Sequence, residues 1–130
     1  MSDTQNTPQD SMFKPGKIGW NELTTTDPAG SIKFYTGLFG WGTEKFPMPD
    51  ADYTLFTHDG QAFGGVMATP APTRWINYVV VEDIDAALAK STSLGGKTMM
   101  GPKDIPMVGR IAVVEDPQGG VIGLHECEKK

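Results

Sequence analysis

Residues 18–40 read IGWNELTTTDPAGSIKFYTGLFG, and residues 74–96 read RWINYVVVEDIDAALAKSTSLGG. Each stretch begins with alternating or β-branched residues, which predict a strand. Each continues with an aspartate, Asp27 or Asp83, which can accept a hydrogen bond at the start of a helix. A glycine 13 residues after each aspartate ends the apolar helical pattern. Because the two aspartates are 56 residues apart, the pattern predicts an internal repeat.

Strand and turn patterns fill the remainder of each half. The dipeptide Asp59-Gly60 predicts a hairpin turn between two apolar runs, and the sequence DPQG predicts a second turn at residues 116–119. Each half therefore predicts the order β-α-β-β-β. After the helices we expect strands at Tyr53–His58, Gln61–Ala68, 97–100, Gly109–Glu115 and 120–126, and loops at 47–50 and 101–106.

The repeat also predicts how the domain is organised. A single copy cannot bury its apolar face alone, so the two copies must share a core. We predict an α+β domain over residues 17–126, with βαβββ half-modules at 17–70 and 74–126. They form an eight-stranded sheet with a concave cleft, and the helices lie on its outer face. Residues 1–16 are polar and aperiodic, so we expect a disordered N-terminal tail, and residues 127–130 form a C-terminal tail.

The composition is that of an ordinary soluble domain. The chain has 130 residues, a net charge of −5 and a mean hydropathy of −0.28. Its Lys and Arg residues are scattered, whereas a nucleic-acid surface needs clustered cations, so we expect no nucleic-acid partner. No apolar stretch suits a membrane span, and the start lacks the apolar core of a signal peptide. Together with a single cysteine, Cys127, these features predict a cytoplasmic protein.

The repeat carries motifs of a known superfamily. They stand at residues 20–23 (WNEL), 34–41 (FYTGLFGW), 81–87 (VEDIDAA), 94–96 (LGG) and 109–119 (GRIAVVEDPQG). On these residues the chain resembles the vicinal oxygen chelate superfamily, which includes glyoxalase I, bleomycin-resistance proteins and extradiol dioxygenases. It is most similar to the glyoxalase-like branch. The resemblance implies a small-molecule ligand and a homodimer in which the concave sheets or the outer strands meet across a twofold axis.

The resemblance also implies four positions for the ligands of one divalent metal. In this sequence they fall on Trp20, Ile76, Gly123 and either Val66 or Met67. An indole, aliphatic side chains and a glycine cannot coordinate a hard or borderline cation. We therefore predict neither a metal site nor another cofactor. The alternative is one divalent metal held by Glu22 together with His125 or His58.

Strand alternation assigns further side chains to the cleft. If Trp20 faces it, then Glu22 and Thr24 face it as well. If Ile76 faces it, so do Tyr78 and Val80, and if Gly123 faces it, so do Val121 and His125. Arg110 is added because its cationic side chain could hold an anionic ligand. The expected ligand-binding residues are therefore Trp20, Glu22, Thr24, Tyr78, Arg110, Gly123 and His125.

The candidate catalytic residues are Glu22, Tyr78 and His125. Glu22 is either a general base beside Tyr78 or His125, or a structural carboxylate hydrogen-bonded by the backbone or by a tyrosine. His125 lies near the end of the last strand, where a solvent-exposed position at the rim is the simpler interpretation. Trp20 either stacks on a planar ligand or fills the core.

The remaining reactive side chains have simple interpretations as well. Arg110 either clamps an anionic ligand or pairs with an acid such as Glu115 or Asp104. His58 adjoins the predicted hairpin turn and is expected at the surface. Cys127 has no base beside it in the sequence, so we do not expect a nucleophile.

Three functions follow from these residues. The first is a small-molecule-binding protein that holds an apolar or aromatic ligand in the cleft without the metal of the superfamily. The second is a metal-dependent lyase, isomerase or dioxygenase with shifted ligands. The third is an interaction module that mainly dimerises. A screen of metals and small aromatic compounds separates the first two.

Overall fold

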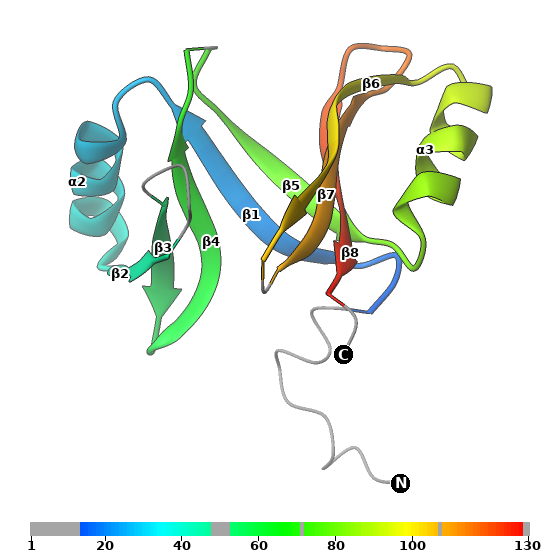
Figure 1. The fold of residues 1–130 in the computed structure, drawn as a ribbon. Coiled ribbons are helices and arrows are strands. Elements are labelled where there is room, and N and C mark those ends of the chain that lie inside the picture. The colour runs from blue at the N-terminus through cyan, green and yellow to red at the C-terminus, as the bar shows by residue number, and fades with distance from the viewer. Residues whose placement is uncertain (1–13, 48–52, 71, 107, 129–130) are drawn as a thin grey trace, which may run out of the picture. The chain divides into compact units, whose positions relative to one another are not determined.

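The computed structural model describes residues 14–47, 53–70, 72–106 and 108–128 (Figure 1). Two helices and eight strands follow one another along this part of the chain, in the order β-α-β-β-β repeated once. They are β1 (Ile18–Thr25), α2 (Pro28–Phe39), β2 (Gly42–Phe46), β3 (Tyr53–His58), β4 (Gln61–Ala68), β5 (Arg74–Val80), α3 (Ile84–Ser93), β6 (Lys97–Ile105), β7 (Gly109–Glu115) and β8 (Val121–Cys127).

The strands form one mixed sheet. They are hydrogen-bonded in the order β2-β3-β4-β1-β5-β8-β7-β6. β1 is parallel to β4, and β5 is parallel to β8. The pairs β2–β3, β3–β4, β6–β7 and β7–β8 are antiparallel. The predicted α+β class, with eight strands in two βαβββ repeats, is confirmed.

The chain divides into two compact units. The first unit is Trp20–Ile76, and the second contains the described residues up to Gly19 together with residues 77–128. The start of β1 belongs to the second unit because it is tied to the end of β5. The N–H of Gly16 donates to the carbonyl of Val80 at 2.7 Å, and the N–H of Val80 donates to the carbonyl of Lys17 at 2.9 Å.

Both helices begin at the predicted aspartates. Asp27 accepts a hydrogen bond from the N–H of Gly30 at 3.1 Å, and Asp83 accepts one from the N–H of Ala86 at 3.1 Å. These contacts satisfy backbone donors that a helix leaves without a partner at its first turn. α2 ends as predicted at Gly40, whose φ of 72° is left-handed.

The core of the first unit lies between α2 and the sheet. Leu23 of β1, Phe56 of β3 and Val66 of β4 are between 0% and 2% exposed. Because Leu23 faces this core, alternation turns Glu22 and Thr24 to the opposite face of the sheet, as the sequence predicts. The partly buried side chains packed against the core are Ile32, Tyr35, Trp41 and Phe63.

The second unit has buried residues around α3 as well. Ile84 is the buried residue of that helix, with 0% exposure, and Ala112 of β7 is also 0% exposed. Figure 1 shows α3 alongside β6, β7 and β8, the strands on which it packs. Neither helix in the described part of the chain is long and apolar enough to cross a membrane.

The structure adds one strand to those expected and extends two others. β2 was not located by the sequence patterns, because four of its five residues are exposed and no apolar alternation marks it. β6 extends to Ile105, although a loop is expected from residue 101, and its pairing with β7 shifts register twice. β8 includes Cys127, which the sequence analysis placed in the tail.

Some expectations lie partly outside the described residues. Residues 1–13 of the expected N-terminal tail are not described, whereas Gly16 at its end is hydrogen-bonded to β5. Residues 48–50 of the expected loop also lie outside the described part, as do residues 129–130.

Candidate functional site

Two aromatic side chains and a buried carboxylate form a hydrogen-bonded chain in the first unit. The indole Nε1 of Trp20 donates to the hydroxyl of Tyr53 at 3.0 Å. That hydroxyl donates to Oε1 of Glu22 at 3.0 Å. Glu22 and Tyr53 are each 8% exposed. Two of the predicted site residues, Trp20 and Glu22, are therefore brought together through a tyrosine that the sequence analysis did not include.

A glycine makes room for this chain. Gly65 of β4 lies opposite Glu22 in the parallel pairing of β1 and β4. A Cβ atom at Gly65 would overlap the Tyr53 ring, and its nearest atom would be the hydroxyl oxygen. Only glycine lets the ring lie this close to the strand backbone. The adjacent glycines of β4 could have indicated this close approach, but nothing in the sequence pointed to Tyr53 as the ring involved.

The other expected positions of the first unit have separate roles. The hydroxyl of Thr24 donates to the backbone carbonyl of Arg74 at 3.3 Å, so it links β1 to the start of β5. Val66 lies in the core on the side of α2. Of the two alternatives for the fourth metal-ligand position, alternation therefore leaves Met67 on the face of Trp20 and Glu22.

The second unit repeats the contact between a tyrosine and a glycine. Tyr78, which is 2% exposed, lies opposite Gly123 in the parallel pairing of β5 and β8. A Cβ atom at Gly123 would overlap the Tyr78 ring. Two more predicted site residues therefore lie in contact.

His125 is buried, which corrects the expectation of a rim histidine in solvent. It is 7% exposed, and its Nε2 lies 2.8 Å from the carbonyl oxygen of Val108. A carbonyl only accepts, so this nitrogen carries the proton. The contact fixes the ring against the segment that precedes β7.

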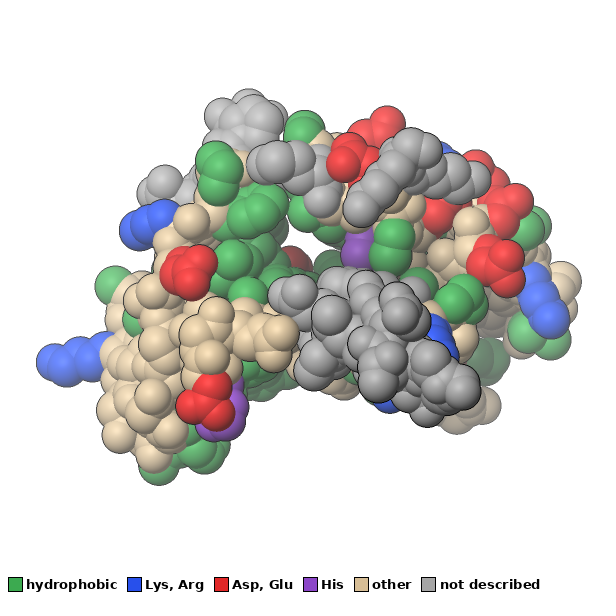
Figure 2. All heavy atoms as spheres, turned by 90° about the horizontal axis from the view of Figure 1, so that it is seen from below, with side chains coloured by type: hydrophobic (Ala, Val, Ile, Leu, Met, Phe, Trp, Pro, Cys, Tyr) green, Lys and Arg blue, Asp and Glu red, His purple; other side chains and the backbone are tan. Residues whose placement is uncertain are grey.

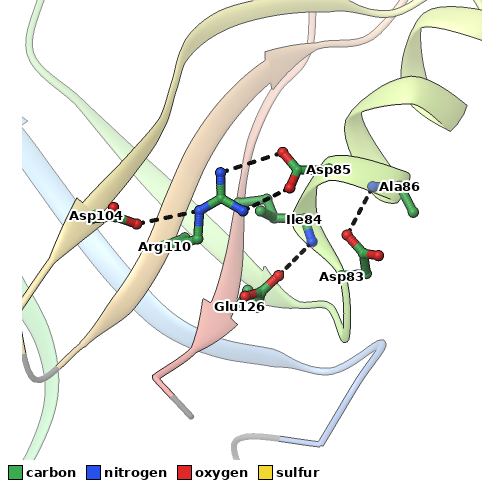
Figure 3. Close-up of polar contacts among 7 residues, drawn as sticks. All are labelled: Asp83, Ile84, Asp85, Ala86, Asp104, Arg110 and Glu126. Carbon is green, nitrogen blue, oxygen red and sulfur yellow. Dashed lines mark hydrogen bonds and ion pairs between the residues drawn. The ribbon is translucent and has the colours of Figure 1, made fainter.

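Arg110 lies on the side of the sheet that faces α3 (Figure 3). Its Nη1 and Nη2 atoms are 2.8 and 3.3 Å from the two carboxylate oxygens of Asp85, and its Nε is 3.3 Å from Asp104. The expected acidic pairing is therefore present, with Asp104 as one of the two partners. Glu126, which pairs with Arg110 across β7 and β8, directs its side chain to the same helix. The position of Arg110 on this side separates it from Gly123 and His125, which alternate with Glu126 along β8.

The ion pair shifts the pKa values of both of its partners, Asp85 and Arg110. The hydrogen bond from Arg110 lowers the pKa of Asp85, and charge attraction adds to this effect. The same hydrogen bond raises the pKa of Arg110. Figure 3 also shows Oε1 of Glu126 accepting a hydrogen bond from the N–H of Ile84 at 2.9 Å, at the first residue of α3. No local sequence pattern marks this capping carboxylate, because it comes from a strand 42 residues away.

The remaining reactive side chains, His58 and Cys127, lie at the ends of β3 and β8. His58 is 69% exposed at the end of β3, with Nδ1 3.7 Å from Asp59. Burial raises the pKa of the Cys127 thiol, which disfavours the reactive thiolate. Among the described residues, no group of three or more His, Cys, Asp or Glu side chains is arranged to hold a metal ion. On the face shown in Figure 2, Lys and Arg side chains are scattered among the other types.

Comparisons with known proteins agree with this fold. The model of the "Glyoxalase/Bleomycin resistance protein/Dioxygenase superfamily" matches residues 17–124. The chain is 35% identical to the "Putative glyoxylase CFP32" of Mycobacterium bovis, over 94% of this chain and 50% of that protein. It is 34% identical to the "Anthracycline biosynthesis protein DnrV" of Streptomyces peucetius, over 86% of this chain and 47% of that protein. The chain thus spans about half the length of the curated relatives it matches.

Two solved structures share the fold at low sequence identity. Methylmalonyl-CoA epimerase of Streptomyces coelicolor, solved in complex with 2-nitronate-propionyl-CoA, has a TM-score of 0.62 at 15% identity, covering 89% of this chain and 100% of that one. Homoprotocatechuate 2,3-dioxygenase of B. fuscum has a TM-score of 0.59 at 21% identity, covering 85% of this chain and 32% of that one. With the family model matched along nearly the whole described chain, this protein belongs to the glyoxalase, bleomycin-resistance and dioxygenase superfamily.

Proposed function

We propose that this protein binds an apolar or aromatic small molecule, without the metal of its superfamily, on the face of the first unit that carries Trp20 and Glu22. The observation that supports this function is the hydrogen-bonded chain from Trp20 through Tyr53 to Glu22. The proposal includes a cytoplasmic location, which the single cysteine favours.

The hydrogen bonds of Trp20 and Tyr53 favour contact with a ligand through the faces of the two rings. The indole N–H of Trp20 and the hydroxyl proton of Tyr53 are both directed to partners inside the protein. The partly buried indole is thereby held in one orientation and presents carbon surface. Stacking on a fixed ring contributes affinity without the entropy loss of ordering a mobile side chain. A flat apolar ligand fits this arrangement better than a charged one.

The metal-free part of the proposal depends on the implied ligand positions. Trp20 and Met67 occupy two of them in the first unit, and Ile76 and Gly123 occupy the other two. None of these residues offers the nitrogen or oxygen donor that a divalent metal of this superfamily requires. Glu22 instead accepts a hydrogen bond from Tyr53, which supports the interpretation of a structural carboxylate.

A binding experiment tests the proposal with a fused-ring compound. The relative named for anthracycline biosynthesis suggests 1,4-dihydroxyanthraquinone as the first probe, alongside smaller planar aromatics. We expect saturable quenching of tryptophan fluorescence and a thermal shift. Trp20→Ala should weaken binding by about 1–2 kcal/mol through lost stacking and burial.

Two variants and a metal assay provide the controls. Trp75→Ala removes an indole that packs against Tyr35 on the side of α2, so it should leave the affinity unchanged. Tyr53→Phe frees the indole of Trp20 and should weaken binding less than Trp20→Ala. Glu22→Gln changes affinity only if the carboxylate itself contacts the ligand. Stoichiometric zinc, nickel or iron in the purified protein would overturn the metal-free proposal, and equal effects of the two tryptophan variants would overturn the site.

A further inference from the structure

A partly buried arginine lies at one end of the proposed ligand site. Arg74 is the first residue of β5, and its neighbour Trp75 packs against α2. Alternation therefore turns Arg74 to the side of the sheet that carries Trp20 and Glu22. Figure 1 shows the start of β5 beside the end of β1, where the hydroxyl of Thr24 donates to the carbonyl of Arg74 at 3.3 Å. We call this side of the first unit the ligand face.

The guanidinium of Arg74 is not paired with an acid. Among the described residues, no carboxylate lies within ion-pair distance of it, and its N–H groups make no hydrogen bond. The side chain is nevertheless partly buried, and a charge that loses water without gaining a partner costs free energy. Arg110, the second arginine of the chain, is bound by Asp85 and Asp104. Of the two arginines, Arg74 is therefore the one available to an anionic ligand.

The neighbours of Arg74 on the ligand face are uncharged. Thr24 lies opposite Met67 in the pairing of β1 and β4. Ile76, two residues after Arg74 and on the same side of β5, is 4% exposed. The carboxylate of Glu22 lies further along β1, is 8% exposed and accepts a hydrogen bond within the protein. An anionic group is repelled near Glu22 and attracted near Arg74, so the two charges give the ligand face a direction.

We propose that Arg74 binds an anionic oxygen group, such as a carboxylate, on the ring of the ligand that lies farthest from Trp20. This inference rests on the proposed function, because Trp20 fixes where the aromatic rings lie. An apolar ring still covers Trp20, and the charge is confined to the opposite end of the ligand. The planar guanidinium can donate two parallel hydrogen bonds to such a group. Arg74 is thereby a residue that selects among flat ligands by their charge.

The length of β1 between these residues suits a ligand of three fused rings. Trp20 and Thr24 are four residues apart, which is about 13 Å on an extended strand. The carbonyl of Arg74 is hydrogen-bonded to Thr24, so the side chain of Arg74 begins near the far end of this span. Three linearly fused rings with an acid group at one end have a similar length. A ligand of this size can therefore contact Trp20 and Arg74 at once.

Two probes that differ in charge test the proposal. Anthraquinone-2-carboxylate carries an acid at the end of its long axis, and anthraquinone-2-carboxamide is its neutral counterpart of nearly the same shape. Isothermal titration calorimetry of the full chain measures both dissociation constants. We expect the carboxylate to bind about tenfold more tightly than the carboxamide, because hydrogen bonds between charged groups are strong. About 0.5 M salt should reduce this preference, since the guanidinium is only partly buried.

Two methionine variants separate the role of Arg74 from that of net charge. Arg74→Met removes the charge and keeps an apolar stem of similar length, so it should abolish the preference for the carboxylate and leave the affinity for the carboxamide nearly unchanged. The matched control is Arg110→Met, which changes the net charge equally but acts in the second unit, on the ion pair with Asp85. It should leave the preference intact. Far-UV circular dichroism checks that both variants are folded.

The outcomes distinguish this inference from the proposed function. If Trp20→Ala weakens both probes but the wild type binds them equally, the ligand site stands and the role of Arg74 is overturned. A preference that Arg74→Met leaves intact would overturn that role too. Equal loss of the preference in Arg74→Met and Arg110→Met would trace it to net charge, with the same consequence. Binding of neither probe would overturn the proposed function, and this inference with it.

Discussion

Helix α2 lies against a cluster of aromatic rings, whereas helix α3 combines one buried isoleucine, Ile84, with an ion pair and a capping carboxylate. In the first unit Tyr35 of α2 contacts the rings of Trp41, Phe56 and Trp75, with centroids 5.3 to 6.2 Å apart. The first turn of α2 contains no acidic residue. In the second unit Asp85 pairs with Arg110, and a strand carboxylate accepts the first N–H of α3. The repeat thus preserves the backbone and the aspartate caps, while the other side chains that attach the helix differ between the two units.

Both units share one further feature, a tyrosine ring that packs on a glycine. Gly65 accommodates Tyr53, and Gly123 accommodates Tyr78. In the first unit the ring comes from β3, so the strand β1 has room for a carboxylate, Glu22, beside it. In the second unit the ring comes from β5 itself and occupies the position that corresponds to Glu22. Among the described residues, this difference accounts for a buried acid, and with it the candidate site, in the first half and not in the second.

The largest expected effect is on the aromatic core. Phe56→Ala should destabilise the protein by about 3–5 kcal/mol, because Phe56 is fully buried and the cavity would remain among four other rings. In the second unit, Ile84→Val should cost only about 0.5–1.5 kcal/mol. Denaturant unfolding measures both.

The tryptophans make this comparison sharper. All three tryptophans of the chain lie in the first unit, so fluorescence reports on that unit, whereas far-UV circular dichroism reports on both. If the units unfold together, Phe56→Ala moves both signals to the same lower midpoint. A fluorescence midpoint that Phe56→Ala does not lower would contradict the role of the ring cluster.

The second effect concerns the paired glycines. Gly65→Ala and Gly123→Ala should each cost about 1–3 kcal/mol, because each new methyl group overlaps a buried ring. Removing the ring should relieve the overlap, so the cost of Gly65→Ala should fall in a Tyr53→Ala background. In a Tyr78→Ala background, Gly65→Ala should keep its full cost, since its ring partner is still present. Additive energies in both backgrounds would show that the rings are not the obstacle.

The sequence predicted the fold where its signals were local. The aspartate caps, the turn residues and the alternation of β1 need only neighbours along the chain, and these elements were placed within a few residues. β2 could not be predicted in this way, because an exposed edge strand carries no apolar alternation. β6 failed because glycine and proline at residues 101 and 102 indicate a loop, whereas its pairing with β7 continues to Ile105.

The candidate site was predictable only in part, because its contacts are distant in sequence. Parity along β1 correctly placed Glu22 on the face opposite the core, yet the tyrosine that binds it is 31 residues away. Parity along β8 placed His125, but its burial depends on a contact with Val108, before β7. Arg110 was expected among the ligand-binding residues, and only the structure shows that α3 supplies its partner. Strand pairing and helix docking decide such contacts, and neither leaves a local pattern.

The smallest expected effect is a difference between the two units in how their stability depends on pH. Arg110 lowers the pKa of Asp85, so the folded state favours the carboxylate. This contribution to stability is present above the pKa of an unfolded aspartate, about 3.9, and is lost as the pH falls through the lower pKa of the folded protein. Asp85→Asn should therefore lower the melting temperature slightly at pH 7 and leave it unchanged near pH 2. Because both side chains reach solvent, added salt should reduce the difference.

The contribution of the helix dipole to stability has to be separated from that of the ion pair. Asp85 lies in the first turn of α3, where a carboxylate is favourable even without a partner. Arg110→Met keeps that carboxylate and removes the partner, so a double-mutant cycle of Asp85→Asn with Arg110→Met isolates the pair. We expect a coupling that vanishes in acid. No ion pair of this kind attaches α2 among the described residues, so the first unit should show no equivalent acid-dependent coupling. A coupling that persists at pH 2 would mean that packing of the two side chains, and not their charge, holds α3 in place.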